Sequence, residues 1–172
     1  MGYVSRMGLL DGWRFCPRCS AEGTHTRSRF ECTACGYVAW ANSVPGVHAL
    51  IERDGKILLG RRAFDPGAGC WGLPGGFLEE GEEPGAGLRR EVREETGLDV
   101  EPGELFGTWM QPHGERTVLC LLWHARLLSG VERAADDVVE LGWFGPDELP
   151  ADMGPSAFAE AVSLWRARHE HA

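Results

Sequence analysis

Three glutamates in the middle of the chain share a spacing that suits metal binding. Glu91, Glu94 and Glu95 stand at positions i, i+3 and i+4, so on a helix their carboxylates emerge from one face. Like charges at this spacing destabilise a helix unless they are neutralised. Mg²⁺ and Mn²⁺ are hard cations that prefer oxygen ligands. The spacing therefore predicts either a divalent cation site or a solvated helix face with Glu–Arg pairs.

The acidic character of the chain is partly local. The protein has 172 residues and a net charge of −9, and the stretch Glu79–Glu95 holds seven glutamates and three arginines, hence −4. Arg90 lies eight residues after Glu82 and four before Glu94, which lets it bridge the preceding loop to a helix. Four glycines of that loop allow it to bend close to a metal and offer backbone groups to phosphate: Gly72, Gly75, Gly76 and Gly81.

The segment from Gly76 to Leu98 resembles the Nudix box, G-x5-E-x7-R-E-U-x-E-E-x-G-U with U apolar. The matching residues are Gly76, Glu82, Arg90, Glu91, Val92, Glu94, Glu95, Gly97 and Leu98. The resemblance extends to Trp71–Gly76 and to Trp143-Phe144 with Asp147–Leu149, and covers roughly residues 44–170. It implies an α/β fold, the Nudix α/β/α sandwich with a mixed sheet. It also implies an enzyme that hydrolyses a nucleoside diphosphate linked to another moiety.

The resemblance also implies roles for single residues. Mg²⁺ or Mn²⁺ would be held by Glu91, Glu94, Glu95 and the backbone carbonyl of Gly75, while Glu82 and Arg90 would brace the loop and the helix. Such metals neutralise a diphosphate and lower the pKa of the attacking water, and a glutamate would orient or deprotonate that water.

An additional base or metal ligand is expected outside the box, as in several Nudix enzymes. The candidates are Glu140, Asp136, Asp137 and Glu115, of which we favour Glu140, three residues before Trp143. The alternative for Glu140 is a solvated carboxylate at a strand edge.

Four of the six cysteines form two Cys-x-x-Cys pairs twelve residues apart: Cys16 with Cys19, and Cys32 with Cys35. Two such knuckles supply the four thiolates of a tetrahedral Zn²⁺ site. Redox pairs or incidental buried cysteines are the alternatives, but a thioredoxin-like site needs a pair that opens a helix in a βαβ unit, a context absent here. We therefore predict a zinc ribbon with structural Zn²⁺. Cys70 and Cys120 stand alone and are expected to be packed or incidental thiols.

The sequence predicts two parts, a lead-in and zinc ribbon over residues 1–40 and the Nudix hydrolase domain over residues 44–172, with Trp40–Pro45 as a linker. In the larger part, strands are expected over residues 47–51, 56–59, 104–109, 117–128 and 138–144, and helices over residues 84–96 and 156–169. Asp65–Gly76 is expected to be a loop and Ser129-Gly130 a turn. Mixed strands with one central and one terminal helix indicate an α/β sandwich.

A zinc ribbon ahead of a Nudix domain resembles two groups of enzymes. NADH pyrophosphatases carry the motif Ser-Gln-Pro-Trp-Pro-Phe-Pro after the box, where this chain has Gly107–Gly114 without that motif. Short zinc-ribbon Nudix proteins are linked to ADP-ribose and FAD, and we favour these substrates, with NAD(H) as the alternative. Candidate substrate contacts are the aromatic residues Phe77, Trp109 and Trp123 and the arginines Arg61, Arg62 and Arg116. Core packing for the aromatic residues and solvation for the arginines are the alternatives.

A nucleotide-sensing Nudix module, with the ribbon contacting protein or nucleic acid, is the alternative from another class. The complete box favours an enzyme, and the balance of 17 basic to 26 acidic residues argues against broad nucleic-acid binding. No apolar run has membrane-spanning length and the first residues lack a signal-peptide segment, so a cytoplasmic protein without membrane contact is expected. A homodimer is compatible with the resemblance.

Overall fold

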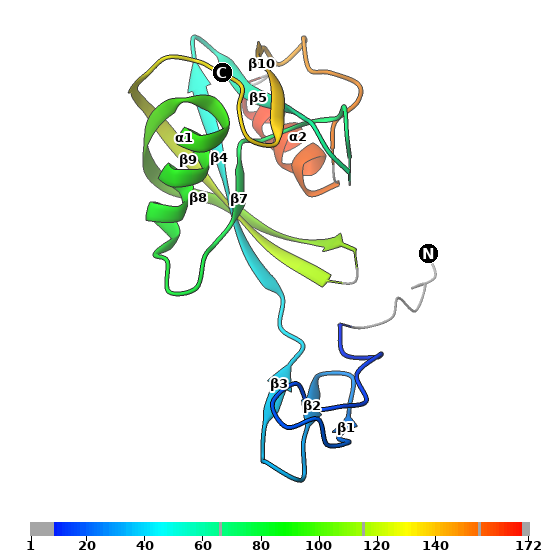
Figure 1. The fold of residues 1–172 in the computed structure, drawn as a ribbon. Helices are drawn as coiled ribbons and strands as arrows, with labels where there is room; N and C mark the ends of the chain where they lie inside the picture. The colour runs from blue at the N-terminus through cyan, green and yellow to red at the C-terminus, as the bar shows by residue number, and fades with distance from the viewer. Residues whose placement is uncertain (1–8, 66, 115, 155, 170–172) are drawn as a thin grey trace. The chain divides into compact units, whose positions relative to one another are not determined.

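The computed structural model describes residues 9–65, 67–114, 116–154 and 156–169 (Figure 1). The chain divides into two compact units. The first comprises the residues up to Val44 together with Pro112–Val118, and the second comprises Pro45–Gln111 and the residues from Leu119 on. Within the described residues, no helix is both long and apolar enough to cross a bilayer.

The first unit contains a small antiparallel sheet in the order β1-β2-β3, with bounds Thr24–His25, Arg29–Glu31 and Val38–Trp40. Its core is built around the fully buried Phe30, which meets the ring of Trp13 edge to face at 5.6 Å. Cys16 and Cys32 are buried beside it. A core of this size gives little apolar stabilisation, so such ribbons depend on a cross-link or a metal.

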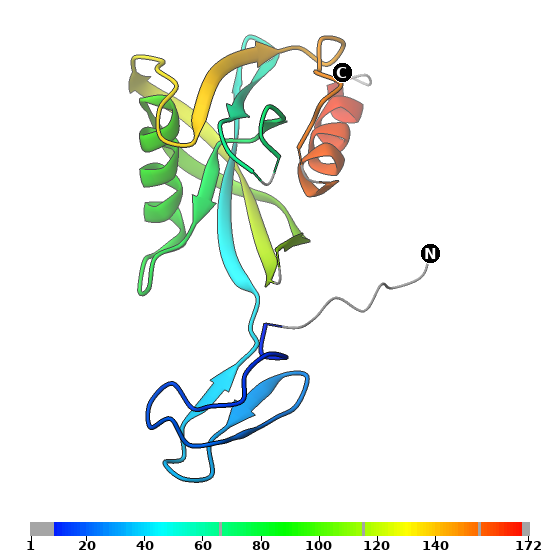
Figure 2. The same ribbon diagram turned by 45° about the vertical axis from the view of Figure 1, so that its right-hand side comes forward.

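The second unit is a seven-stranded mixed sheet covered by two helices. The strands are β4 (Val44–Arg53), β5 (Lys56–Arg62), β6 (Trp71–Gly72), β7 (Gly75–Phe77), β8 (Leu98–His113), β9 (Arg116–Gly130) and β10 (Val138–Phe144), and the helices are α1 (Pro84–Thr96) and α2 (Ser156–His169). The order is β10-β5-β4-β9-β8, with β6 paired to β5 and β7 to β4. Figures 1 and 2 show α1 and α2 on opposite faces of the sheet, which confirms the α/β/α sandwich.

The alternation of side chains along β4 explains why a helix layer packs on each face of the sheet. Val47, Ala49 and Ile51 belong to the hydrophobic cluster that includes α1, whereas Leu50 belongs to the cluster that includes α2. Successive side chains of a strand point to opposite faces, so a strand with apolar residues at nearly every position is buried on both sides. On α2, the apolar side predicted from the sequence is buried as expected: Phe158, Ala161, Val162 and Trp165.

Helix α1 has the predicted bounds because both ends are capped. Pro84 occupies the first turn, and the side chain of Glu83 accepts a hydrogen bond from the backbone N–H of Ala86 at 2.9 Å. Gly97 adopts φ 72° and donates its N–H to the carbonyl of Arg93 at 3.0 Å. These caps place the three box glutamates on a regular helix.

Several predicted strands are shorter than the observed ones, and two segments predicted to be loop or linker contain parts of strands. Strand β8 runs over residues 98–113 because Pro102 lies on the edge strand of the sheet, where a missing N–H is tolerated. Strand β9 continues to Gly130 through the predicted turn. The predicted loop at residues 65–76 contains β6 and the start of β7, and the predicted linker at residues 40–45 holds the end of β3 and the start of β4. Glycine and proline there permit close backbone pairing and do not end the strands.

Candidate functional site

Arg90 joins the loop before α1 to the helix. Its Nε and Nη2 each donate to one carboxylate oxygen of Glu82 at 2.8 Å, and Nη2 also donates to the carbonyl of Phe77 at 3.1 Å. Its Nη1 donates to Glu91 at 2.8 Å and to Glu94 at 3.1 Å. The hydrogen bonds from Arg90 lower the pKa of Glu82 to about 2, while Glu82 raises the pKa of Arg90. One guanidinium thus holds three box carboxylates in a fixed arrangement.

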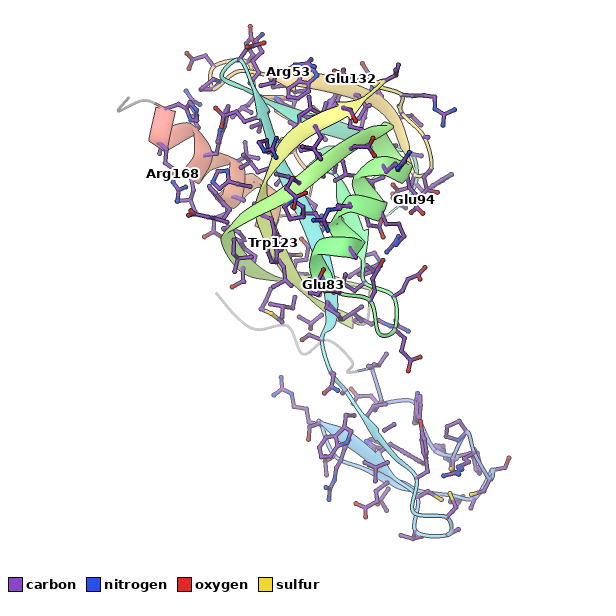
Figure 3. The ribbon with its side chains drawn as sticks, turned by 90° about the vertical axis from the view of Figure 1, so that its left-hand side faces the viewer. Arg53, Glu83, Glu94, Trp123, Glu132 and Arg168 are labelled. Atoms are coloured by element: carbon purple, nitrogen blue, oxygen red, sulfur yellow. The ribbon has the colours of Figure 1, made fainter. Side chains whose placement is uncertain are left out.

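Glu91 lies against the backbone of Gly76. A Cβ atom at Gly76 would lie 2.5 Å from Glu91 Oε2, so a side chain there would displace the carboxylate from this position. Burial raises the pKa of Glu91. Glu94, near the end of α1 in Figure 3, has a half-exposed side chain. The box therefore presents one largely covered carboxylate, Glu91, and one accessible carboxylate, Glu94, a turn apart.

Glu95 is the most buried carboxyl group of the helix, with 4% of the residue exposed. Its Oε2 accepts the backbone N–H of Gly75 at 2.8 Å. Burial raises its pKa to about 9, and the charge of Asp137 beside it adds to the shift. An ionised Glu95 is therefore unfavourable unless positive charge is supplied.

The loop between β9 and β10 brings two more carboxylates to α1. The backbone N–H groups of Arg133 and Ala135 donate to the last carbonyls of the helix, those of Thr96 at 2.9 Å and Glu95 at 3.1 Å. The loop ends at Asp136 and Asp137, whose charges raise the pKa values of Glu91 and Glu95 respectively.

Asp137 links this loop to β5. Its Oδ2 pairs with Arg62 at 3.2 Å, while its Oδ1 is buried and receives no hydrogen bond within the described residues. A buried carboxylate oxygen next to a second carboxyl group needs a proton or a cation. Since carboxylates are preferred ligands of Mg²⁺ and Mn²⁺, this donor set fits a divalent cation.

The favoured outside candidate, Glu140, lies on β10 and pairs with Arg61 at 3.3 Å, with both side chains about half exposed. Arg61 Nε also donates to the carbonyl of Gly69 at 3.0 Å. The contacts of Glu140 are thus with β5, and Asp137 is the outside carboxylate that reaches Glu95. A metal-ligand role for Glu140 stays a prediction. Glu115 lies outside the described residues.

The aromatic and arginine candidates are spread over the structure. Phe77 is 43% exposed on β7, and Trp109 stacks on Phe106 with ring centroids 6.2 Å apart. Trp123 on β9 packs against the cluster that includes α1, and Figure 3 shows its position. Arg116 is exposed at the start of β9. Phe77 also contacts the box, because its backbone carbonyl accepts a hydrogen bond from Arg90.

A cavity of about 20 Å³ lies beside Glu95 and Gly75. Its other walls include His48 of β4, Arg62 of β5 and Phe158 of α2. His48 is 7% exposed, and burial lowers its pKa to about 4. His48 was not predicted from the sequence, where its one signal is a single polar residue in the apolar run of residues 47–51.

The four cysteines of the ribbon converge in the first unit. Their Sγ atoms all lie within 4.8 Å of one another, with 3.6 Å between Cys16 and Cys35 and between Cys19 and Cys32. Four sulfurs at about 2.3 Å from a tetrahedral Zn²⁺ would be about 3.8 Å apart. The backbone N–H of Cys35 is the main cause that lowers the pKa of Cys32 to about 7. The cluster fits a zinc ion.

Both knuckles use the same backbone hydrogen bonds. Cys16 donates its N–H to Ala21 and accepts from Ser20, and Cys32 donates to Tyr37 and accepts from Gly36, at 2.8–2.9 Å in every case. Ser20 and Gly36 occupy equivalent left-handed positions, with φ 60° and 72°. This repetition turns each pair of thiols toward the other pair.

Comparison with known proteins gives consistent results. The family model described as the NUDIX domain matches residues 42–163. A MutT-like protein of Streptomyces ambofaciens is 40% identical over 111 residues, which cover 64% of this chain and 68% of that protein. An ADP-ribose pyrophosphatase of Methanocaldococcus jannaschii is 34% identical over 116 residues, 66% of this chain and 69% of that protein.

A longer match includes the ribbon. The NAD-capped RNA hydrolase NudC of Stutzerimonas stutzeri is 31% identical over 177 residues, which cover 98% of this chain but 62% of that protein. This chain therefore spans less than two thirds of that relative. Among solved structures, the crystal structure of a NUDIX hydrolase from Nitrosomonas europaea has a TM-score of 0.81 at 28% identity, covering 93% of this chain and 94% of that one.

Proposed function

This chain belongs to the Nudix hydrolase family, and from this premise we propose that it hydrolyses the diphosphate of ADP-ribose or FAD to a nucleoside monophosphate and a second phosphate ester. The observation that carries the proposal is the group of carboxylates around α1. Glu95 is buried, the side chain of Glu91 is 12% exposed, and within the described residues Asp137 has a buried carboxylate oxygen without a donor. Such an arrangement is costly in a protein without a ligand and useful in one that binds cations.

We propose that Glu91, Glu94, Glu95 and the carbonyl of Gly75 hold Mg²⁺ or Mn²⁺, with Asp137 as a further candidate beside Glu140. When bound, such a metal would neutralise the diphosphate and lower the pKa of the attacking water.

The chain's own groups act around that site. Arg90 fixes Glu82 and the box loop, so that the carboxylates keep their geometry when a highly charged substrate arrives. Gly75 and Gly76 let the backbone approach neighbouring protein atoms closely, because a Cβ atom at either position would overlap them. Their backbone groups are proposed to face phosphate oxygens. Arg61 and Arg62 are cations on the neighbouring strand and are proposed to meet the distal phosphate or ribose.

The choice of substrate is supported by the relative named ADP-ribose pyrophosphatase and by the lack of the NADH motif in Gly107–Gly114. NAD(H), or an NAD-capped RNA, is the second candidate, favoured by the match to NudC over nearly the whole of this chain. We further propose that Cys16, Cys19, Cys32 and Cys35 bind a structural Zn²⁺. A cytoplasmic enzyme for a small nucleotide, as a monomer or a homodimer, is the setting we propose.

The test is a substrate panel with Mg²⁺: ADP-ribose, FAD, NADH and an NAD-capped RNA, with products identified by chromatography. Glu94→Gln and Glu95→Gln should each abolish turnover while the far-ultraviolet circular dichroism stays unchanged. Glu101→Gln is the matched control, because Glu101 forms an exposed pair with Arg89 away from the box carboxylates. Metal-dependent turnover of none of the four compounds would contradict the proposal and favour a nucleotide-sensing module.

A further inference from the structure

The cavity beside Glu95 contains a polar atom that the protein leaves without a partner. His48 Nδ1 is buried and has no hydrogen bond within the described part of the chain. The imidazole packs edge to face on Phe158, with 4.6 Å between ring centroids, so its orientation is fixed. A buried polar atom without a partner costs stability. That cost is removed when a ligand atom forms a hydrogen bond with Nδ1.

The surroundings of the ring decide what the free nitrogen can do. Burial lowers the pKa of His48 and keeps the ring neutral, while the backbone of Leu73 acts on that pKa in the opposite direction, as an acceptor for a ring N–H does. Because Nδ1 has no partner, the donor is Nε2. Nδ1 of the neutral ring then carries a lone pair and acts as an acceptor. The ligand group must therefore donate a hydrogen bond.

We infer that this cavity is a subsite for one hydroxyl group of the substrate's sugar, with His48 Nδ1 as its hydrogen-bond acceptor. The inference rests on the proposed function, since the cavity shares Glu95 and Gly75 with the proposed hydrolytic site. His48 is thus a specificity-determining residue.

Size and polarity select a hydroxyl group. A volume of about 20 Å³ holds a group of the size of one water molecule, and a base or a phosphate is much larger. Leu73, Val138 and Phe158 supply apolar walls. Arg62 and Glu95 both line the cavity, so its charge does not select an anion. A sugar hydroxyl meets each condition, as it is small, uncharged and a donor.

Gly75 keeps the subsite open. Its φ is +139°, and a Cβ atom there would lie 2.9 Å from His48 Nδ1 and 2.1 Å from the carbonyl oxygen of Val47. A side chain at this position would therefore cover the acceptor. The same glycine donates its N–H to Glu95, which couples the position of the subsite to that of the box.

The test compares ADP-ribose with its monodeoxy analogues, each lacking one ribose hydroxyl, on the wild-type protein, His48→Leu and His48→Gln. The quantity is the ratio of kcat/KM for ADP-ribose to that for each analogue, because this ratio does not depend on the folded fraction of a preparation. For one analogue, the ratio measured with the wild-type protein should be about three to ten. In His48→Leu that ratio should fall to about one, while His48→Gln, which keeps an acceptor, should retain part of it. His124→Leu is the matched control, since His124 packs on Phe106 and does not line the cavity.

If every analogue gives the same ratio in His48→Leu as in the wild-type protein, the cavity holds a resident water and the inference is wrong. That result leaves the proposed function intact, provided that the wild-type protein hydrolyses ADP-ribose. If the wild-type protein hydrolyses none of these compounds, the proposed function is wrong. The subsite is then tested by comparing the dissociation constants of ADP-ribose and of each analogue, measured in EDTA. Equal dissociation constants for all analogues would then refute the subsite as well.

Discussion

Burial of Glu95 should make the metal-free protein less stable as the pH rises. Its folded pKa of about 9 exceeds the ordinary value of 4.5 expected in the unfolded chain. The folded state therefore holds the proton more tightly, so the stabilisation is fully present below pH 4.5 and is lost as the pH rises toward 9. One pKa unit corresponds to about 1.4 kcal/mol, so moving from pH 5 to pH 7 should cost on the order of 3 kcal/mol.

The assay is urea unfolding in EDTA at pH 5, 6 and 7, for the wild-type protein and Glu95→Gln. Glutamine has the same shape, accepts from the Gly75 N–H and does not titrate, so the difference between the two pH profiles isolates Glu95. Mg²⁺ at pH 7 should restore wild-type stability by about 2.7 kcal/mol at a hundred times its dissociation constant. Parallel pH profiles in EDTA would show that Glu95 is ionised in the folded protein and would refute the reasoning.

Gly76→Ala should reduce turnover by at least about tenfold, since its Cβ overlaps a box carboxylate, whereas Gly12→Ala, with open space around it, should be neutral in both activity and thermal unfolding. Cys19→Ser should remove Zn²⁺ as measured by elemental analysis, while Cys70→Ser retains it; equal zinc content in both would refute the ribbon site. The backbone carbonyl of Trp165 and, after it, the carboxylate of Glu52 raise the pKa of His169. The stability that this pair contributes is fully present below pH 6.5 and is lost as the pH rises through the folded pKa. His169→Ala should therefore flatten the dependence of the melting temperature on pH above pH 6.5. An unchanged slope of melting temperature against pH would exclude the pair.

Elements with local signals could be predicted from the sequence. The bounds of α1 follow from Pro84 and Gly97, and those of α2 from its apolar periodicity. Strand β8 could not be predicted in full, because Pro102 indicates a turn unless the strand is known to lie at the sheet edge. Position within a sheet is a property of the tertiary structure, so no local pattern reveals it.

The same distinction applies to the site. The spacing of the box places three glutamates on one helical face, and the structure has them there. The approach of Asp137 to Glu95 depends on backbone hydrogen bonds from a loop some forty residues downstream, so the sequence left it among several candidates. The importance of His48 arises from a missing hydrogen bond, which only the packed structure shows.

The two hydrophobic clusters on either side of the sheet have a consequence for evolution. The glutamate-bearing helix packs on one cluster, while His48 faces Phe158 in the other. Effects of substitutions at distant sites without shared partners are close to additive. Residues of the α2 cluster that lie away from the cavity can therefore vary without weakening the α1 side, whereas His48 and Phe158 share a cavity with Glu95 and cannot vary independently of it. Such a division lets the packing of one layer drift while the helix that carries the box glutamates is kept.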